Sequence, residues 1–445
     1  MELAERYENV GVIGAAGKMG SGIALLLSQQ MAERKLDPKG KGRHFRLVAM
    51  DVDDAGLDGL RSYLAAQMRK AAEKMTVALR GLYADRADLV ENSEIIDAFI
   101  DDAVGVVRFT TDLNALKDCH MIFEAIAENI PLKVKIYSRL NELCGPDTWF
   151  FTNTSSVPIS LLDRDANLGG RIIGYHFYNP PAVQKLLELI TTPATKPELI
   201  EAGKAIAADL RKKVIPANDI AGFIGNGHFI RDGLHGIAET ERLAKEHGFA
   251  EAVYMVNRVS QDWLVRPMGI FQLIDYVGVD VFQCILGVMN PHIDGEDLHS
   301  DLIDKLMKAG VKGGQNPDGS QKNGILQYVK GRPAGAYSFD KSGYVPLEAA
   351  WTGKLDALLG ALPAGHAPWK ALMGDPGKDE KLAAYFKNMK KDAGMGSRLG
   401  TTYLKRSKEI GEHLVSSGVA AQADDVNGVL MNGFFHLYGP INDYA

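Results

Sequence analysis

Two features of this sequence have residue types and spacing suited to chemistry. His176 stands between aromatic residues in GYHFYNPP (174–181), at the end of an apolar run that reads as a buried strand. Imidazole titrates near pH 6.5 when unperturbed, so a neutral histidine can accept a proton at about neutral pH. Near the N-terminus, glycines recur at every third position in VIGAAGKMGSG (12–22). Such a turn lets the backbone approach a pyrophosphate. Together these features suggest proton transfer beside a bound dinucleotide.

Each feature also has a purely structural alternative. A lone histidine in an apolar run is more often a hydrogen-bonded core residue than a catalyst. A glycine triplet can be an ordinary turn in another α/β protein, and here its spacing, G-x-x-G-x-x-G, is one residue longer than the common G-x-G-x-x-G. The elements around the two features must therefore decide between these readings.

The glycines lie between two apolar strands, at 10–13 and in RLVAMD (46–51), with a helix after the turn. This order is the first half of a dinucleotide-binding unit. Gly14 would permit the turn, Gly17 would let the backbone approach the pyrophosphate, and Gly20 would let helix and strand pack closely. Asp51, at the tip of the second strand, would accept hydrogen bonds from the adenosine ribose and repel a 2'-phosphate. The pattern therefore favours NAD over NADP.

Further apolar runs follow, separated by helical patterns: Met121 to Ala125, then a helix from about Leu132 to Leu143, then TWFFTNTSSVPI, RIIGYHFYNPP and LLELI. Such alternation predicts a doubly wound sheet whose carboxyl strand ends meet at one crevice, where ligands bind. Glu128, Ser155, His176 and Asn179 follow or end these strands. We therefore expect their side chains at that crevice.

Composition limits the other classes of function. The net charge of −6 argues against a nucleic-acid surface. There is no run of 18 apolar residues, so no membrane span is expected, and MELAERYENV lacks the apolar core of a secretory signal. Cys119, Cys144 and Cys284 have no ligand-like spacing, so we expect no metal site and reduced thiols in a cytoplasmic protein.

Seven segments, taken in order, resemble L-3-hydroxyacyl-coenzyme A dehydrogenase, the NAD-dependent oxidation step of fatty-acid β-oxidation. They are VIGAAGKMGSGIA, FEAIAEN, NTSS, GYHFYNPP, LLELI, GFIGN and RPMGIFQLIDYVG, and the resemblance covers roughly residues 8 to 345. It implies that His176 is the catalytic base, paired with Glu188 and assisted by Ser155 and Asn226. The chemistry also suits these residue types: a base must reach the hydroxyl, a carboxylate orients the imidazole, and polar groups bind the reacting oxygen.

The resemblance implies further contacts. For the cofactor they are Gly14, Gly17, Lys18, Met19, Gly20, Asp51, Glu128, Lys133 and Asn153, and for an acyl-CoA substrate they are Ser155, Asn179, Asn226 and Lys74. Lys74 lies in RSYLAAQMRKAAEKM, where the family contacts coenzyme A. Gln67 in that segment replaces a family serine. A related dehydrogenase of a free hydroxy acid or sugar acid is therefore an alternative, as is a non-catalytic NAD-binding structural protein.

The C-terminal half reads as mostly helical. GVAAQADDVNGV (418–429) matches GFAEAVYMVNRV (248–259) at five positions, which suggests an internal repeat. Multifunctional relatives of the family carry such a duplicated helical domain. We predict an NAD-binding Rossmann domain at 1–218, a helical C-terminal domain at 219–340 and a degenerate second copy at 341–445. The second copy would replace the partner subunit, giving a monomer with an internal pseudo-dimer, or else a homodimer.

Overall fold

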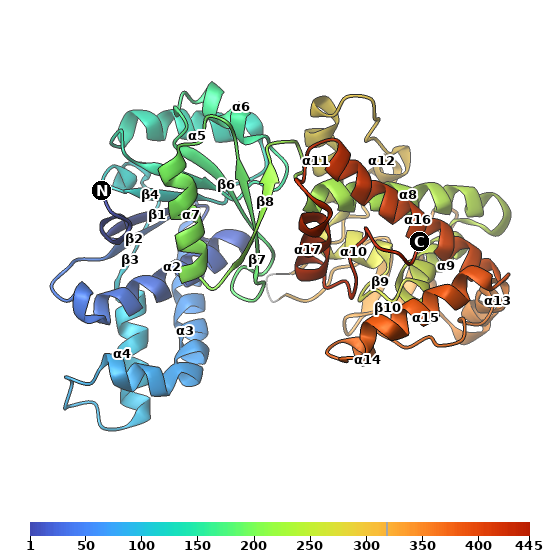
Figure 1. Cartoon of the computed structure of the whole chain (residues 1–445), viewed down its shortest axis with the longest axis horizontal. Coiled ribbons are helices and arrows are strands. Elements are labelled where there is room, and N and C mark those ends of the chain that lie inside the picture. The colour runs from blue at the N-terminus through green and yellow to red at the C-terminus, as the bar shows by residue number, and fades with distance from the viewer. Residues whose placement is uncertain (317–318) are drawn as a thin grey trace. The chain divides into compact units, whose positions relative to one another are not determined.

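The computed structural model describes residues 1–316 and 319–445. These residues form two compact units, Met1–Asp219 and Ile220–Ala445; Figure 1 colours the chain from blue at the N-terminus to red at the C-terminus. The first unit is built on a large sheet with helices on both faces. The second is mainly helical. The further division of the second unit near residue 341 stays a prediction.

The first unit contains an eight-stranded sheet of order β3-β2-β1-β4-β5-β6-β7-β8. Its strands are β1 (Asn9–Ile13), β2 (Arg46–Met50), β3 (Val107–Thr110), β4 (Met121–Glu124), β5 (Trp149–Thr152), β6 (Ile172–Phe177), β7 (Leu186–Thr191) and β8 (Lys213–Asn218). The strands from β3 to β6 are parallel, in the order of a dinucleotide-binding fold. The sequence did not reveal that β7 runs antiparallel to β6, with β8 parallel to β7.

Helices cover both faces of this sheet, which explains why its strands are apolar runs rather than alternating patterns. The helices are α1 (Leu3–Arg6), α2 (Lys18–Leu36), α3 (Asp54–Leu82), α4 (Asn92–Gly105), α5 (Ile130–Leu143), α6 (Ile159–Asp165) and α7 (Pro197–Asp209). One core joins α2, α3, α4 and α7 to the sheet, and α5 and α6 pack against each other over the opposite face. In Figure 1, α3 and α4 lie side by side beside the sheet.

Helix α5 shows how local sequence fixes a functional face. It begins before Leu132, the start that we predicted, because the Asn129 side chain accepts a hydrogen bond from the Leu132 backbone N–H at 2.9 Å and Pro131 lies in the first turn. Lys133 and Tyr137, four residues apart, are thus on the buried face of α5.

The second unit has one core, to which residues from both of its halves contribute. Its helices are α8 (Gly225–His247), α9 (Phe249–Arg258), α10 (Ile270–Val277), α11 (Val279–Met289), α12 (Asp301–Lys308), α13 (Ala349–Leu359), α14 (Trp369–Leu372), α15 (Lys378–Lys391), α16 (Met395–Ser416) and α17 (Ala423–Gly433). A small antiparallel sheet, β11-β10-β9, was not predicted: β9 (Leu326–Val329), β10 (Arg332–Ser338) and β11 (Gly343–Pro346). Lys330 and Gly331, both at positive φ, form its first turn.

The two halves of this unit share one backbone device. Gly248 and Gly418 each follow a long helix at positive φ. The Asn257 side chain accepts the Phe271 N–H at 3.1 Å, and that of Asn427, which lies 170 residues after Asn257, accepts the Ile441 N–H at 3.0 Å. The shared spacing supports the internal repeat.

Among the described residues, no single helix is long and apolar enough to cross a membrane. Two consecutive helical segments, Ile270–Val277 and Val279–His292, are together long and apolar enough, but they are bent by 87° relative to each other.

Candidate active site

The glycine-rich turn between β1 and α2 has the geometry that a dinucleotide pyrophosphate requires. Gly14 has a φ of +74°, which favours glycine, and Gly17 is the exposed N-cap residue that immediately precedes α2. A Cβ atom on Gly20 would lie 1.9 Å from the carbonyl oxygen of Gly14, so only glycine fits there. The first turn of α2 carries no acidic side chain. Its N–H groups and positive dipole end therefore suit a phosphate group.

Asp51 lies immediately after β2, beside this turn. Its Oδ2 accepts a hydrogen bond from the Ala16 N–H at 2.9 Å, and its Oδ1 accepts one from the Val52 N–H at 2.7 Å. The carboxylate is thus held against the glycine-rich turn, where a ribose hydroxyl would meet it. These residues fit NAD as the cofactor.

A buried ionic network lies at the end of β4. Glu124 is fully buried, and its Oε1 is 2.6 Å from the Nζ of Lys133, which is also buried. Tyr137 and Thr152 donate hydrogen bonds to the other carboxylate oxygen of Glu124 at 3.1 and 2.7 Å. Burial alone would lower the pKa of Lys133, but Glu124 and Glu128 outweigh it and raise that pKa. Lys133 is therefore a charged residue, and Glu124, which contacts it, Tyr137 and Thr152, ties β4, β5 and α5 together.

Glu128 connects this network to the turn after β5. Its Oε1 accepts hydrogen bonds from the Thr154 hydroxyl at 2.5 Å, from the Ser155 N–H at 2.9 Å and from the Ser156 N–H at 3.1 Å. Its Oε2 lies 3.3 Å from Lys133 Nζ. Burial opposes ionisation of Glu128, but Lys133 and these hydrogen bonds prevail and lower its pKa. An ionised Glu128 thus fixes the backbone that carries Ser155.

His176 and Glu188 form a buried pair across the antiparallel strands. They are directly opposite in the register of β6 and β7. His176 Nδ1 lies 2.8 Å from Glu188 Oε2, and the Glu188 side chain is fully buried. Because a carboxylate only accepts hydrogen bonds, Nδ1 carries the hydrogen when the ring is neutral, and Nε2 is then the basic nitrogen. The geometry is that of a base oriented by a carboxylate.

The remaining predicted residues fall into three groups. Asn153 immediately follows β5, and its Oδ1 accepts the Phe177 N–H at 2.8 Å, which ties the ends of β5 and β6 together beside Ser155 and His176. Asn179 lies on the turn that follows β6, and Lys18 and Met19 are the first two residues of α2. Lys74 is exposed on α3, and Asn226 is in the first turn of α8, in the second unit. The roles of these residues stay predictions.

The sequence analysis missed two members of the site. Glu124, at the end of an apolar strand, is the acid that neutralises Lys133. Tyr178 donates its hydroxyl to Glu188 Oε2 at 2.8 Å, the same oxygen that His176 contacts. The spacing could have indicated Tyr178, because it lies two residues after His176, and residues two apart on an extended chain point to the same side.

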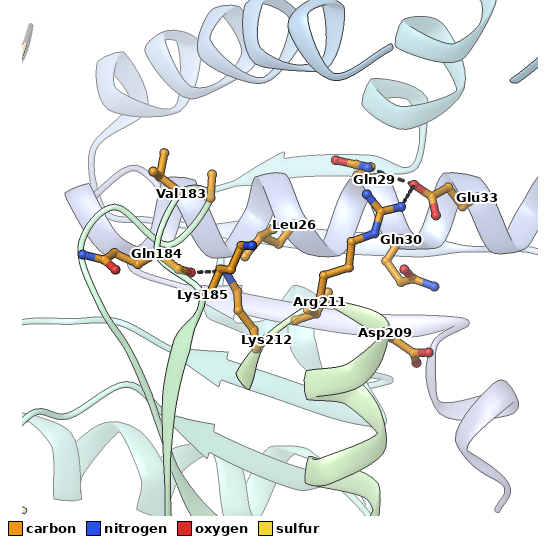
Figure 2. A pocket seen from close by; sticks show the side chains of 12 residues that line it. Leu26, Gln29, Gln30, Glu33, Val183, Gln184, Lys185, Asp209, Arg211 and Lys212 are labelled. Carbon is orange, nitrogen blue, oxygen red and sulfur yellow. Dashed lines mark hydrogen bonds and ion pairs between the residues drawn. The ribbon is translucent and has the colours of Figure 1, made fainter. Parts of the chain in front are cut away.

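A separate cavity lies between α2, the segment after β6 and the start of β8 (Figure 2). It is lined by Leu26, Gln29, Gln30, Glu33, Ala182, Val183, Gln184, Lys185, Asp209, Leu210, Arg211 and Lys212, none of which is a predicted site residue. Lys212 Nζ donates to the carbonyl oxygens of Pro181 and Gln184, and burial lowers the pKa of Lys212 to about 8. Lys212 thereby fastens the segment that follows His176.

Comparisons with known proteins agree with this geometry. The model of the 3-hydroxyacyl-CoA dehydrogenase NAD binding domain matches residues 9–220, and that of the family's C-terminal domain matches residues 237–323. A probable 3-hydroxybutyryl-CoA dehydrogenase of Deinococcus radiodurans is 28% identical over 321 residues, covering 70% of this chain and 99% of the relative. The crystal structure of Mycobacterium tuberculosis FadB2 is 28% identical, with a TM-score of 0.55, and the match covers 73% of this chain and 99% of that chain.

The fold extends over nearly the whole chain in a third comparison. The crystal structure of 3-hydroxybutyryl-CoA dehydrogenase from Escherichia coli K12 matches 98% of this chain and 90% of its own, with a TM-score of 0.65 at 19% identity. The predicted fold class, the predicted NAD cofactor and the predicted class of NAD-dependent oxidoreductase are thereby confirmed. The chain belongs to the 3-hydroxyacyl-CoA dehydrogenase family.

Proposed function

We propose that this protein oxidises L-3-hydroxyacyl-CoA to 3-oxoacyl-CoA with NAD, in fatty-acid β-oxidation or related acyl-CoA metabolism. The observation that carries the proposal is the His176–Glu188 pair, in which a buried carboxylate orients an imidazole at the carboxyl end of β6. Family membership supports the reaction class, and the names of the relatives support a CoA thioester as substrate.

The residues have distinct roles in the proposed reaction. NAD, when bound, accepts a hydride from the carbon that carries the hydroxyl. His176 takes the hydroxyl proton at Nε2, and Glu188 stabilises the imidazolium that forms. Ser155 and Asn226 donate hydrogen bonds to the reacting oxygen or to the thioester carbonyl, where negative charge develops. In the reverse direction the imidazolium returns the proton to the oxygen.

Several dependent proposals rest on sequence resemblance. Lys74 on α3 binds a phosphate of coenzyme A, and Asn179 contacts the substrate. Glu128 and Lys133 lie near the nicotinamide part of the cofactor. Lys18, Met19 and Asn153 also contact the cofactor. We further propose a cytoplasmic enzyme that is a monomer with an internal pseudo-dimer, or a homodimer.

The first test is oxidation of NADH with acetoacetyl-CoA, followed by absorbance. The wild type is compared with His176→Ala, with NADPH in a parallel assay. We expect rapid loss of NADH, little activity with NADPH, and a loss of about a hundredfold or more in His176→Ala. Equal turnover of free acetoacetate would refute the acyl-CoA assignment in favour of a free hydroxy acid. Absence of turnover in a wild type that binds NAD would favour a non-catalytic role.

A further inference from the structure

Glu188 Oε2 is shared between two donors. His176 Nδ1 and the Tyr178 hydroxyl oxygen each lie 2.8 Å from it. The two rings are neighbours, with centroids 4.8 Å apart and planes tilted by 39°. The imidazole thus meets a carboxylate oxygen that already accepts a second hydrogen bond.

We propose that Tyr178 is a positioning residue whose hydroxyl, by sharing Glu188 Oε2, limits how strongly that carboxylate stabilises protonated His176. A neutral donor draws electron density from the oxygen without adding charge. The carboxylate is therefore a weaker partner for the imidazolium than it would be with His176 alone. In this way Tyr178 sets the pH range over which His176 changes its charge.

The phenol is suited to act as a permanent donor. Burial, reinforced by the adjacent Glu188 carboxylate, raises the pKa of Tyr178 well above its ordinary value. The hydroxyl therefore keeps its hydrogen throughout the range in which an imidazole titrates. Its orientation is also constrained, because a protonated phenol beside a carboxylate oxygen gains by donating to it.

The other groups of the first unit around this pair have different partners. β8 places Ile215 beside Glu188 in the sheet register. Glu128 and Lys133 hold the turn that carries Ser155. Lys212 is near the ring of Phe177, one residue from His176 and on the opposite side of β6, with its Nζ 5.8 Å from the ring centroid. Tyr178 differs from these groups in placing a hydroxyl on the oxygen that His176 contacts.

The test is an NMR titration of His176 in the full-length protein labelled with ¹³C at histidine, with the signal assigned by its loss in His176→Asn. Tyr178→Phe keeps the ring and removes the hydroxyl. We expect its His176 midpoint to lie about 0.5 to 1 pH unit above that of the wild type, because Oε2 then loses the hydrogen bond that competes with the imidazole. Tyr175→Phe is the matched control: Tyr175 is a buried tyrosine of β6 that donates to the Gly203 carbonyl oxygen at 2.9 Å. It should leave the midpoint unchanged.

A second variant keeps the Tyr178 hydroxyl and tests whether a stronger hydrogen bond from it shifts the His176 midpoint downward. Site-specific 3-fluorotyrosine at position 178 makes the hydroxyl a stronger donor and should lower the midpoint. Equal midpoints in wild type and Tyr178→Phe, or a lower midpoint in Tyr178→Phe, would overturn the proposal. So would an upward shift with 3-fluorotyrosine.

The proposal rests on His176 being the base of the proposed function, and activity supplies a separate measurement. With acetoacetyl-CoA, the alkaline limb of NADH oxidation should move upward in Tyr178→Phe by the same interval as the NMR midpoint. A shifted NMR midpoint without turnover of acetoacetyl-CoA would support the role of Tyr178 and refute the substrate. Turnover with an unshifted NMR midpoint would support the substrate and refute the role of Tyr178.

Discussion

Glu188→Gln should slow the enzyme by about a thousandfold while leaving the fold intact. Glutamine has nearly the same size as glutamate, and its amide oxygen can still accept the hydrogen of His176 Nδ1, so the ring keeps its orientation. The negative charge is lost, however. Two unit charges about 4 Å apart interact by about 4 kcal/mol at the effective dielectric constant of about 20 that applies in proteins. The atoms that carry these charges are 2.8 Å apart at the closest point.

That energy is available only when the imidazole is protonated, as the proposed mechanism requires in the transition state of alcohol oxidation. Its loss therefore raises the barrier rather than weakening ground-state binding. Since about 1.4 kcal/mol corresponds to a factor of ten in rate, a loss of about 4 kcal/mol predicts about a thousandfold. The decrease should fall on kcat, with a small change in KM.

The assay is steady-state oxidation of L-3-hydroxybutyryl-CoA by NAD. Glu201→Gln is the matched control, because Glu201 is an exposed glutamate paired with Lys204 on α7. Thermal unfolding and NAD binding should be similar in all three proteins. A decrease of less than tenfold in Glu188→Gln, with NAD binding retained, would refute the reasoning that Glu188 stabilises a developing imidazolium. The double variant with His176→Ala should be no slower than His176→Ala alone.

Three further predictions concern the cofactor turn and the stability of the two units. Gly20→Ala should weaken NAD binding about tenfold to a hundredfold, because the new Cβ would lie 1.9 Å from a backbone oxygen of the turn. Titration calorimetry measures this affinity. The control, Gly59→Ala, has open space around its Cβ and should bind NAD as the wild type does. Lys133→Met should lower the free energy of unfolding by about 3–5 kcal/mol, since it leaves the buried Glu124 carboxylate without its nearest counter-charge. In urea unfolding, the double variant with Glu124→Gln should recover much of the lost stability. A loss below about 1 kcal/mol in Lys133→Met would contradict a buried ion pair between Lys133 and Glu124. Burial lowers the pKa of His228 to about 4. Between about pH 6.5 and pH 4, His228 is therefore protonated in the unfolded chain but neutral in the folded protein. His228 should thus lower the free energy of unfolding by about 3 kcal/mol once the pH has fallen to about 4. His228→Gln should show a correspondingly shallower loss of stability with falling pH, and an unchanged pH dependence would contradict this.

The nucleotide-binding half of the fold was predictable from local sequence. Short apolar runs, a glycine turn and an acid after the second run specify strand, helix and strand almost without tertiary information. Gly14 needs a positive φ and Gly20 needs the absence of a Cβ, so the pattern of glycines reports backbone geometry directly. Strand direction is different, because an apolar run reads the same for parallel and antiparallel pairing. The reversal at β7 was therefore hidden.

The same limit explains what was missed at the site. His176 and Glu188 were paired by resemblance, whereas the contact itself depends on the antiparallel register. Glu124 looked like a polar strand end because its partner, Lys133, comes from the next helix. Tyr178 looked like one more aromatic residue beside the histidine. Side-chain partners that are distant in sequence are set by packing, and the local sequence around each residue does not encode them.

The antiparallel junction between β6 and β7 makes the His176–Glu188 pair a property of strand alignment rather than of loop length. Side chains alternate faces along each strand, so a slip of one residue would turn Glu188 away from the imidazole and bring Leu187 or Leu189 in its place. Lys212 holds the connecting segment at Pro181 and Gln184, so an insertion at Val183, which is 70% exposed, should leave the pair intact as long as the register of β6 and β7 is kept. For protein engineering, this separates an exposed surface segment from the fixed alignment of the His176–Glu188 pair only a few residues away.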